Sequence, residues 1–429
     1  MKLDLSKVLN FINNNKFHDA LKLINELENN HKENFELINI KGFTLLRLYE
    51  FEKSIEYFTK ALMQKENSFL TLCYRSAAYS EIGNYENALS DLKKADSLEP
   101  DSHEILFSIG DVYSNLGNND KAIEYFLKSV ENKNDFDVAI ENIITKMSEI
   151  NSFKKKNNKF IETNHLINKI HYDYSDTEKI KEDTIKSLFD KANKTIEKNF
   201  KNLITSQTQI FRRNKDQLNC DRHFIVFNNF KAIPKFCFSC FKVTIELKNV
   251  IDLIKLYLIF ENISLTRNNI RKCMIESRAD VNGSYKGFIY CNSLEEAKTI
   301  QTQLKSVVEK NISSKLVPEI KRGCTEFGVK YPKYKEFEHN SMEYKQEWNK
   351  FEETVDKKFP KFLSNKKDRE TVKGINLRDI LIIKNWLLFA KLIGDNSYQR
   401  ITNENLVNKN IEKQFSDKIE SINNNYIKK

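Results

Sequence analysis

Six of the seven cysteines lie between residues 220 and 324, and these thiols are the side chains with the most distinctive chemistry. Cys237 and Cys240 form a C-F-S-C pair, a spacing common in zinc and iron–sulfur sites. With Cys291 and Cys324 they make a candidate site for zinc or an iron–sulfur cluster, although no cofactor is assured. No second CxxC pair exists, so buried free thiols and a single reactive thiol remain as alternatives.

A second candidate site is a short segment in which a cation and a glycine precede aromatic residues, Lys286-Gly287-Phe288-Ile289-Tyr290. In a strand, alternation places Phe288 and Tyr290 on one face, where rings can stack on bases. The segment is similar to the central-strand motif of RNA-recognition domains, which implies a nucleic-acid face at Lys286, Phe288 and Tyr290. The first strand of the predicted domain offers Lys242, Thr244 and Glu246 to the same face, with no stacking aromatic residue.

Motifs of the common enzyme classes are missing from the sequence. There is no glycine-rich phosphate loop, no HExxH sequence and no nucleophile elbow. The seven histidines are scattered, and only His223, close to Cys220, is considered as a ligand. The sequence therefore favours a binding protein, and a cysteine-dependent or metal-dependent enzyme remains an alternative.

The elements that must position these residues alternate between strand and helix. Strands are predicted at 240–247, 271–278, 285–291 and 316–321, and helices at 249–262 and 293–310. The order β-α-β-β-α-β is that of a ferredoxin-like α+β domain. In that topology Cys237, Cys240, Cys273, Cys291 and Cys324 are expected on one rim of the sheet.

The N-terminal part of the chain repeats with a period of 34. One column of the repeat holds small residues, Ala20, Ser54, Ala88 and Ala122. Four positions later large apolar residues recur, Ile24, Phe58, Leu92 and Phe126. The period and the small–large pattern resemble the tetratricopeptide repeat (TPR) over residues 3–132, and the helix Val138–Met147 is expected to cap the stack. The resemblance implies an α-solenoid of helix pairs.

In such a solenoid the first helices line a concave groove. By register, the groove residues are Asn39, Phe43, Leu46, Cys73, Ala77, Phe107 and Asp111. They include no cluster of lysine and arginine, so an acidic peptide tail is a poor ligand. An acidic, partly apolar groove favours a basic amphipathic segment, including one from the same chain. A solvated face without a ligand is the alternative.

Charge divides the chain into two parts. Residues 1–150 carry 17 Lys and Arg against 25 Asp and Glu, whereas residues 151–429 carry 53 against 35. We expect a TPR superhelix at 1–150, a basic linker at 151–176, a long connecting helix at 177–213, the ferredoxin-like α+β domain at 220–330 and C-terminal helices at 331–429.

These features predict a protein–protein interaction scaffold, in which the TPR groove binds a peptide or partner helix and a basic α+β effector domain follows. Nucleic-acid (RNA) binding through the strand 286–290 is the alternative. The sequence contains no apolar run long enough to cross a membrane and no signal-peptide pattern, which favours a cytoplasmic location. It leaves the partner and the oligomeric state open.

Overall fold

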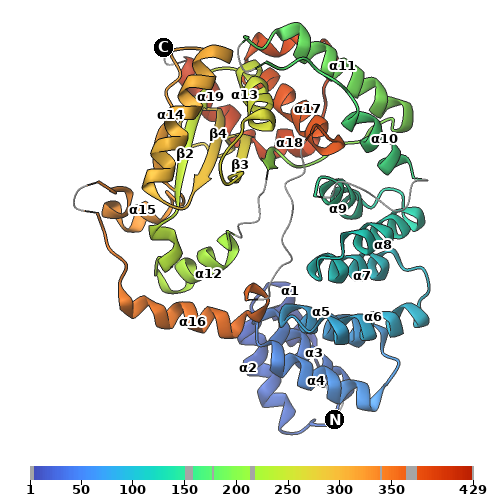
Figure 1. Ribbon diagram of the computed structural model, residues 1–429. Helices are drawn as coiled ribbons and strands as arrows, with labels where there is room; N and C mark the ends of the chain where they lie inside the picture. The colour runs from blue at the N-terminus through green and yellow to red at the C-terminus, as the bar shows by residue number, and fades with distance from the viewer. Residues whose placement is uncertain are drawn as a thin grey trace. The chain divides into compact units, whose positions relative to one another are not determined.

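A computed structural model describes residues 4–149, 158–175, 178–212, 218–338, 341–363 and 374–427. The chain forms two compact units, each made of two stretches of sequence. The first unit, called here the repeat unit, contains residues 1–143 and 350–367. The second, called the sheet unit, contains residues 144–349 and 368–429. Figure 1 shows the elements of both.

The repeat unit is built from antiparallel helix pairs. The pairs are α1 (Ser6–Asn13) with α2 (Phe17–Glu28), α3 (Phe35–Arg47) with α4 (Phe51–Gln64), α5 (Phe69–Glu81) with α6 (Tyr85–Leu98), and α7 (His103–Asn115) with α8 (Asn119–Asn132). Helix α9 (Asp137–Met147) follows. The predicted repeat of helix pairs is therefore present over the predicted residues.

Close helix approach explains why the small residues recur. A side chain at Gly110 would place its Cβ 2.7 Å from the ring of Phe126, and one at Gly42 would meet Phe58 at the same distance. Phe58 and Phe126 are fully buried. Each large ring of a second helix thus fills the space that a small residue of the first helix leaves.

The turn within each pair uses the same backbone conformation. Asn15, Tyr49, Gly83 and Gly117 occupy one column of the repeat, and all have positive φ, between 56° and 77°. Glycine adopts this left-handed region without steric cost, whereas a tyrosine there is strained. Tyr49 is therefore the exception in an otherwise favourable column.

A segment from far along the chain completes the repeat unit. Helix α16 (Asn349–Lys358) and the 3-10 turn η4 (Pro360–Phe362) pack at the turns of the second and third helix pairs. The sequence predicts one C-terminal helical region over 331–429, and the structure divides it between the two units. The division follows Phe359, whose ring packs on Tyr49 and Phe51 of the repeats.

A five-stranded antiparallel sheet forms the centre of the sheet unit. The strands are β1 (Gln209–Arg212), β2 (Phe241–Leu247), β3 (Arg271–Ile275), β4 (Tyr285–Cys291) and β5 (Glu319–Arg322), in the order β1-β3-β4-β2-β5. Helices α13 (Val250–Asn262) and α14 (Leu294–Asn311) lie between β2 and β3 and between β4 and β5 in the chain. The predicted order of strands and helices is therefore present, with β1 as an added edge strand.

Two predicted segments differ from the structure. Residues 159–168, expected within a linker, form helix α10 (Lys159–Asn168), whose Phe160 packs on Phe200 with ring centroids 4.7 Å apart. The predicted helix 177–213 is only α11 (Glu182–Asn199), since Phe200 turns to extended backbone and residues 209–212 join the sheet. The part of the linker at 151–157 lies outside the described residues.

The remaining helices include α17 (Leu377–Leu392), which with α13 is among the most buried helices in the described part of the chain. Helix α17 begins with a capping box between Asn376 and Asp379 and packs its Trp386 against the sheet unit's core. The shorter elements are α12 (Cys220–Phe230), η1 (Lys235–Phe238), α15 (Phe327–Lys330), η2 (Pro332–Lys335), η3 (Gln346–Trp348), η5 (Asn396–Arg400), α18 (Lys409–Gln414) and α19 (Ser416–Ile427).

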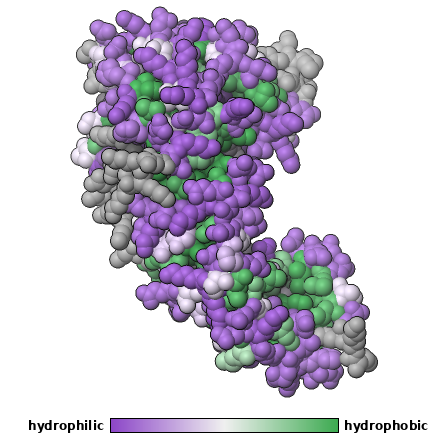
Figure 2. Space-filling model, turned by 90° about the vertical axis from the view of Figure 1, so that its right-hand side faces the viewer, coloured by the Kyte–Doolittle hydropathy of each residue, from purple (hydrophilic) through white to green (hydrophobic). Residues whose placement is uncertain are grey.

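The face drawn in Figure 2 is mainly hydrophilic, and smaller hydrophobic areas interrupt it. Among the described residues no helix combines the length and apolar character needed to cross a bilayer. The most exposed large apolar side chains include Met63, Val329 and Val317.

Candidate functional site

The predicted groove residues all come from first helices of the pairs, namely α3, α5 and α7. Ala77 and Asp111 are exposed, and the other five are partly buried. Phe43 packs against Tyr74 with ring centroids 5.0 Å apart, and Phe107 packs against Phe126 at 5.3 Å. Both rings therefore stabilise the packing of the repeats, in addition to their predicted role in the groove.

Cys73, another of the predicted groove residues, lies on α5. Desolvation by burial raises the pKa of its thiol to about 11, and the charges of Glu99 and Asp91 act in the same direction. Asp91 itself accepts two hydrogen bonds from Arg75, at 2.7 and 2.8 Å. The thiol is thus protonated at neutral pH, which suits packing and does not suit nucleophilic chemistry.

The turn edge of the repeats, defined by Tyr49, Phe51, Glu50 and Glu81, already holds a ligand-like segment of the same chain. The ring of Phe359 packs on Tyr49 and Phe51, with centroids 5.9 and 6.0 Å away. Phe359 is buried there. The apolar part of this contact is therefore an aromatic cluster between helix pairs.

Two ion pairs flank the aromatic cluster. Lys361 Nζ lies 2.5 Å from Glu81 Oε2, and Lys358 Nζ lies 3.7 Å from Glu50 Oε1. Both pairs are partly exposed, so each contributes about 0–1 kcal/mol and mainly fixes orientation. The segment is basic and aromatic, and the surface that receives it is acidic and aromatic.

A second candidate site is the open face of the sheet, the side opposite α13 and α14. In the ladder Lys242 pairs with Tyr290, Thr244 with Phe288, and Glu246 with Lys286. Lys272 of β3 also pairs with Phe288, and Lys321 of β5 pairs with Lys242. The alternation thus places the predicted Lys286, Phe288 and Tyr290 on one face, together with two cations of neighbouring strands.

Cations surround the ring of Phe288. The ammonium groups of Lys242 and Lys272 lie 5.3 and 5.2 Å from its centroid. A base that stacks on this ring would have to displace a lysine. The geometry therefore gives the base-stacking prediction no direct support, and RNA binding stays a prediction.

On the same face, two cationic side chains balance the negative charge of Glu276. Arg278 Nε donates to its Oε1 at 2.9 Å, and Lys286 Nζ donates to its Oε2 at 3.0 Å. These hydrogen bonds overcome burial and lower the pKa of Glu276 to about 2. Glu276 is thus an ionised structural partner of Lys286, which restricts that lysine as a ligand contact.

Three of the four predicted metal ligands come together at the rim of the sheet. The thiol of Cys237 is hydrogen-bonded to that of Cys324, an interaction that lowers the pKa of Cys324. The sulfur of Cys240 packs against Gly323. Burial raises the pKa of Cys240 to about 12.

Cys291 and Cys220 depart from the predicted set. Cys291 has the register of Ile289 and Gly287, the face of β4 that packs on the helices, so it points away from the open face. Cys220, at the start of α12, interacts electrostatically with Cys237 and Cys240. Within the described ranges no three His, Cys, Asp or Glu side chains are arranged to hold a metal ion. A metal at Cys237, Cys240, Cys291 and Cys324 therefore remains a prediction.

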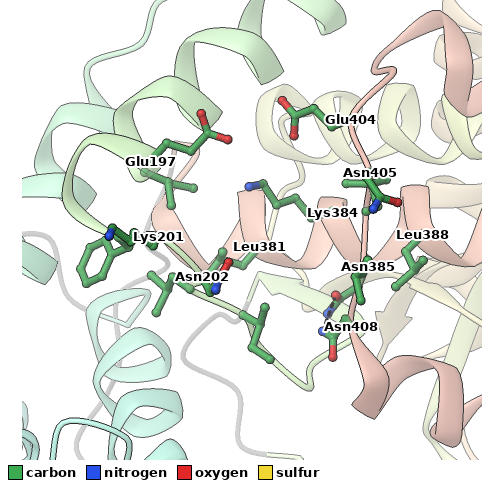
Figure 3. Close-up of a pocket in the computed structure, with 16 residues that line it drawn as sticks. Glu197, Lys201, Asn202, Leu381, Lys384, Asn385, Leu388, Glu404, Asn405 and Asn408 are labelled. Atoms are coloured by element: carbon green, nitrogen blue, oxygen red, sulfur yellow. Dashed lines mark hydrogen bonds between the residues drawn. The ribbon is translucent and has the colours of Figure 1, made fainter.

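A cavity of about 340 Å³ in the sheet unit was not predicted. It lies between the end of α11, the start of the 200–204 loop, α17 and the 404–408 loop (Figure 3). Lys384 lies near Glu197 and Glu404, whose charges partly oppose the lowering of its pKa by burial. Asn385 and Asn408 are hydrogen-bonded to each other at 2.9 Å, so these amides mainly hold the loops.

A buried ionic network lies in the interior of the sheet unit. Arg212 Nη2 is 2.6 Å from Asp379 Oδ2, and Arg212 Nε is 2.5 Å from Glu261 Oε1. The hydroxyl of Tyr257 donates to Asp379 Oδ2 at 2.9 Å. Burial raises the pKa of Glu261 to about 7. No ligand can reach this network without opening the core, so its role is structural.

Sequence reasoning missed the turn edge, although one signal was available. The tyrosine at position 49 occupies a turn column that asparagine and glycine fill elsewhere. A strained residue with an exposed ring suggests that the side chain is needed for a contact. No comparable sequence pattern indicates that Phe359 and Lys361 contact the repeats.

Comparisons with known proteins agree with the repeat unit. The family model described as "Tetratricopeptide repeat" matches residues 73–102 and 103–136. A curated relative, the small glutamine-rich tetratricopeptide repeat-containing protein 2 of Mycosarcoma maydis, is 27% identical over 96 residues. That match covers 22% of this chain and only 27% of the relative's length.

Solved structures of similar helical repeats include MamA and YrrB. The crystal structure of MamA is 19% identical, with a TM-score of 0.32, over 47% of this chain and all of that one. YrrB, described as a TPR protein with an unusual peptide-binding site, is also 19% identical, with a TM-score of 0.29, over 30% of this chain and 67% of that one. From the recurring helix pairs and the family match, we identify the N-terminal repeats of this chain as tetratricopeptide repeats.

Proposed function

We propose that this chain is a protein-interaction scaffold whose repeat unit binds basic, aromatic peptide segments. The observation that carries the proposal is the segment of residues 350–363 on the turn edge of the repeats. It displays the chemistry that the surface accepts: a phenylalanine between two lysines, followed by proline. The chain's own segment thus acts as the first ligand of the repeats.

The strain at Tyr49 supports this proposal. A non-glycine residue with φ of 62° costs about 1–3 kcal/mol, which glycine at the same position would avoid. The ring of Tyr49 receives Phe359, and Lys358 lies 6.0 Å from the same ring. A tyrosine retained at an unfavourable turn position is best explained by this contact.

The concave face is the proposed site for a second protein partner. Its proposed contact residues are the seven predicted from the register, of which Ala77 and Asp111 are exposed. We interpret the sheet unit as a ferredoxin-like domain with one added edge strand, and as the basic effector that the repeats bring to a partner. Four of the seven groove residues lie within the part of the chain that the family model matches, whereas the sheet unit lies outside it.

A labelled peptide tests the turn edge. Residues 349–363 are synthesised with a fluorophore, and binding to the full chain is followed by anisotropy. In the intact chain the tethered segment competes at an effective concentration near 1 mM, so the peptide binds weakly. A chain with Phe359→Ala and Lys361→Ala exposes the edge and should bind the peptide at least about tenfold more tightly.

Charge variants locate the binding surface. In the exposed-edge chain, Glu81→Lys should weaken peptide binding, whereas Glu104→Lys, an exposed acid of α7, should leave it unchanged. Equal binding to the intact and the exposed-edge chain would contradict the proposal. Loss of binding with Ala77→Arg and not with Glu81→Lys would move the site to the concave groove.

A further inference from the structure

The open face of the sheet contains a cavity of about 640 Å³ with an excess of positive charge. Seven lysine and arginine side chains line it against three glutamates, and Lys242, Phe288 and Lys321 form its floor at the sheet. A volume of this size suits a small organic ligand. The charge balance indicates that the ligand is anionic.

Lys242 is the strongest evidence for an anion. Its side chain is buried, and among the described residues it has neither a carboxylate nor a hydrogen-bond partner, only the face of Phe288. Burial of an ammonium group costs several kcal/mol, whereas a cation–π contact returns about 0.5–2 kcal/mol. The more distant charges of Glu326 and Cys324 act favourably on Lys242 but do not outweigh its burial, so the described residues compensate its charge only in part.

Lys272, on strand β3, adds a second positive charge next to Phe288. It lies beside the same ring, and within the described ranges it donates a hydrogen bond to the neutral amide oxygen of Gln209, at 3.2 Å. Burial, followed by the charge of Lys242, lowers its pKa to about 8. A buried and a half-buried cation thus act on each other across one phenylalanine.

The nearby carboxylates are already engaged. Glu276 binds Arg278 and Lys286, Glu319 binds Lys321 at 2.8 Å, and Glu326 binds Arg278 at 3.3 Å. Glu246, at the far end of the cavity, is exposed. None of these acids forms an ion pair with Lys242 or Lys272 among the described residues, so a bound anion would supply the direct counter-charge that both lysines lack.

We propose that the open face of the sheet is a binding site for a small phosphorylated molecule, whose phosphate lies in the cavity against Lys242. Phosphate oxygens accept several charge-assisted hydrogen bonds, which matches the ammonium groups that line the cavity, Lys242 and Lys321 among them, better than a single carboxylate does. Lys242 and Lys272 cover Phe288, so the ring supports the cations. The site differs from a base-stacking surface in this respect.

Calorimetry with pyrophosphate and with ATP tests the proposal on the full chain. The matched variants are Lys242→Met in the cavity and Lys305→Met on the exposed side of α14. One or both probes should bind the wild type and the Lys305→Met variant alike. Lys242→Met should reduce affinity by about tenfold or more, since one hydrogen bond to a charged group contributes about 1.5–3 kcal/mol.

Thermal unfolding supplies a readout that separates ligand binding from a structural role. Without ligand, Lys242→Met should raise the melting temperature of the sheet unit, because methionine removes a buried charge that is compensated only in part. With ligand, the wild type should gain stability and the variant should gain little. A variant that is less stable than the wild type in both conditions would overturn the proposal.

Two further results would also overturn it. One is the absence of binding by either probe up to millimolar concentration. The other is tight binding of a uridine oligonucleotide that Phe288→Ala abolishes and Lys242→Met leaves intact, which would assign the face to base stacking.

Discussion

The repeat unit and the sheet unit are stabilised by contacts of different range. In the repeats, the Ser54 hydroxyl donates to Gly42 O at 2.9 Å, and Arg75 pairs with Asp91 at 2.7 Å, so each contact joins two helices that follow each other in the chain. In the sheet unit, Arg212 pairs with Asp379, 167 residues away. Local contacts build the helix pairs of the repeat unit, whereas distant contacts build the sheet unit.

This difference determines how each unit should lose stability when a residue is substituted. A repeat array loses stability gradually, because each helix pair interacts with its neighbours. The sheet unit depends on a few groups in which distant segments meet, and the loss of one partner leaves a buried charge without compensation. The sheet unit should therefore be the more sensitive to single polar substitutions.

The chain offers a direct way to observe the two units separately. Its two tryptophans, Trp348 and Trp386, both belong to the sheet unit. Tryptophan fluorescence therefore reports unfolding of that unit, while far-ultraviolet circular dichroism also reports the helices of the repeats.

The largest effect is expected for Asp379→Ala. The substitution removes one of the two carboxylates that pair with the buried Arg212, and it also removes the acceptor of Tyr257, at a cost of about 3–5 kcal/mol. Urea denaturation should show an earlier fluorescence transition while much of the helical signal persists. Asp417→Ala, an exposed acid in the first turn of α19, is the control and should change little. A coincident shift of both signals would show that the units unfold together.

The next effect is expected for Gly110→Val in the repeats. Its side chain would overlap the ring of Phe126, where even a Cβ lies at 2.7 Å, so we expect a loss of about 1–3 kcal/mol. Here the circular-dichroism transition should move and the fluorescence transition should not. Ala77→Val, an exposed position of α5, controls for helix propensity. An unchanged circular-dichroism transition would mean that the two helices can separate enough to admit the new side chain at little cost.

A smaller effect, of about 1.5 kcal/mol, is expected for Glu276→Gln at neutral pH. The pKa of Glu276 is lowered to about 2 from an ordinary value of 4.5, so its ionised form stabilises the fold. That contribution is complete above pH 4.5 and is lost as the pH falls toward 2. The difference between wild type and variant in the fluorescence transition should therefore shrink between pH 5 and pH 2. Glu295→Gln, exposed in α14, should show no such dependence.

The smallest effect on stability is expected for Tyr49→Gly. Relief of the left-handed strain offsets the lost ring contacts, so the net change should stay within about 1 kcal/mol. Amide hydrogen exchange should nevertheless accelerate in residues 349–358, because Phe359 loses part of its site. Asn15→Gly relieves the same strain at a turn away from α16 and should leave that exchange unchanged. Slow exchange in both variants would show that Tyr49 is dispensable for docking.

Much of the fold could be predicted because its signals are local. The period of the repeats predicted the helix pairs, and alternation predicted β4 with its bounds, Tyr285–Cys291. The helix predicted over 293–310 begins where expected, because the Ser293 hydroxyl accepts a hydrogen bond from Glu296 N at 3.1 Å and caps α14. Each of these features depends on residues close together in the chain.

The candidate sites were predicted only in part. The face of Phe288 and Tyr290 followed from strand alternation, but the lysines that cover Phe288 come from two other strands. Cys237 and Cys324 were expected to meet, whereas Cys220 was not included. A single sequence contains no information on which cation lies over which ring, because that depends on strand order and register.

By itself, the sequence determined the tetratricopeptide helix pairs, the order of strands and helices from 240 to 322, and the acidic-to-basic division of charge. Tertiary structure alone decided that residues 350–363 pack on the repeats, that Arg212 and Asp379 meet, and that Lys242 is buried without an ion-pair partner among the described residues. Periodicity and capping act over one or two turns of chain, so the sequence displays them directly. Burial and ion pairing between distant segments of the chain depend on which surfaces remain to be covered once those elements have formed.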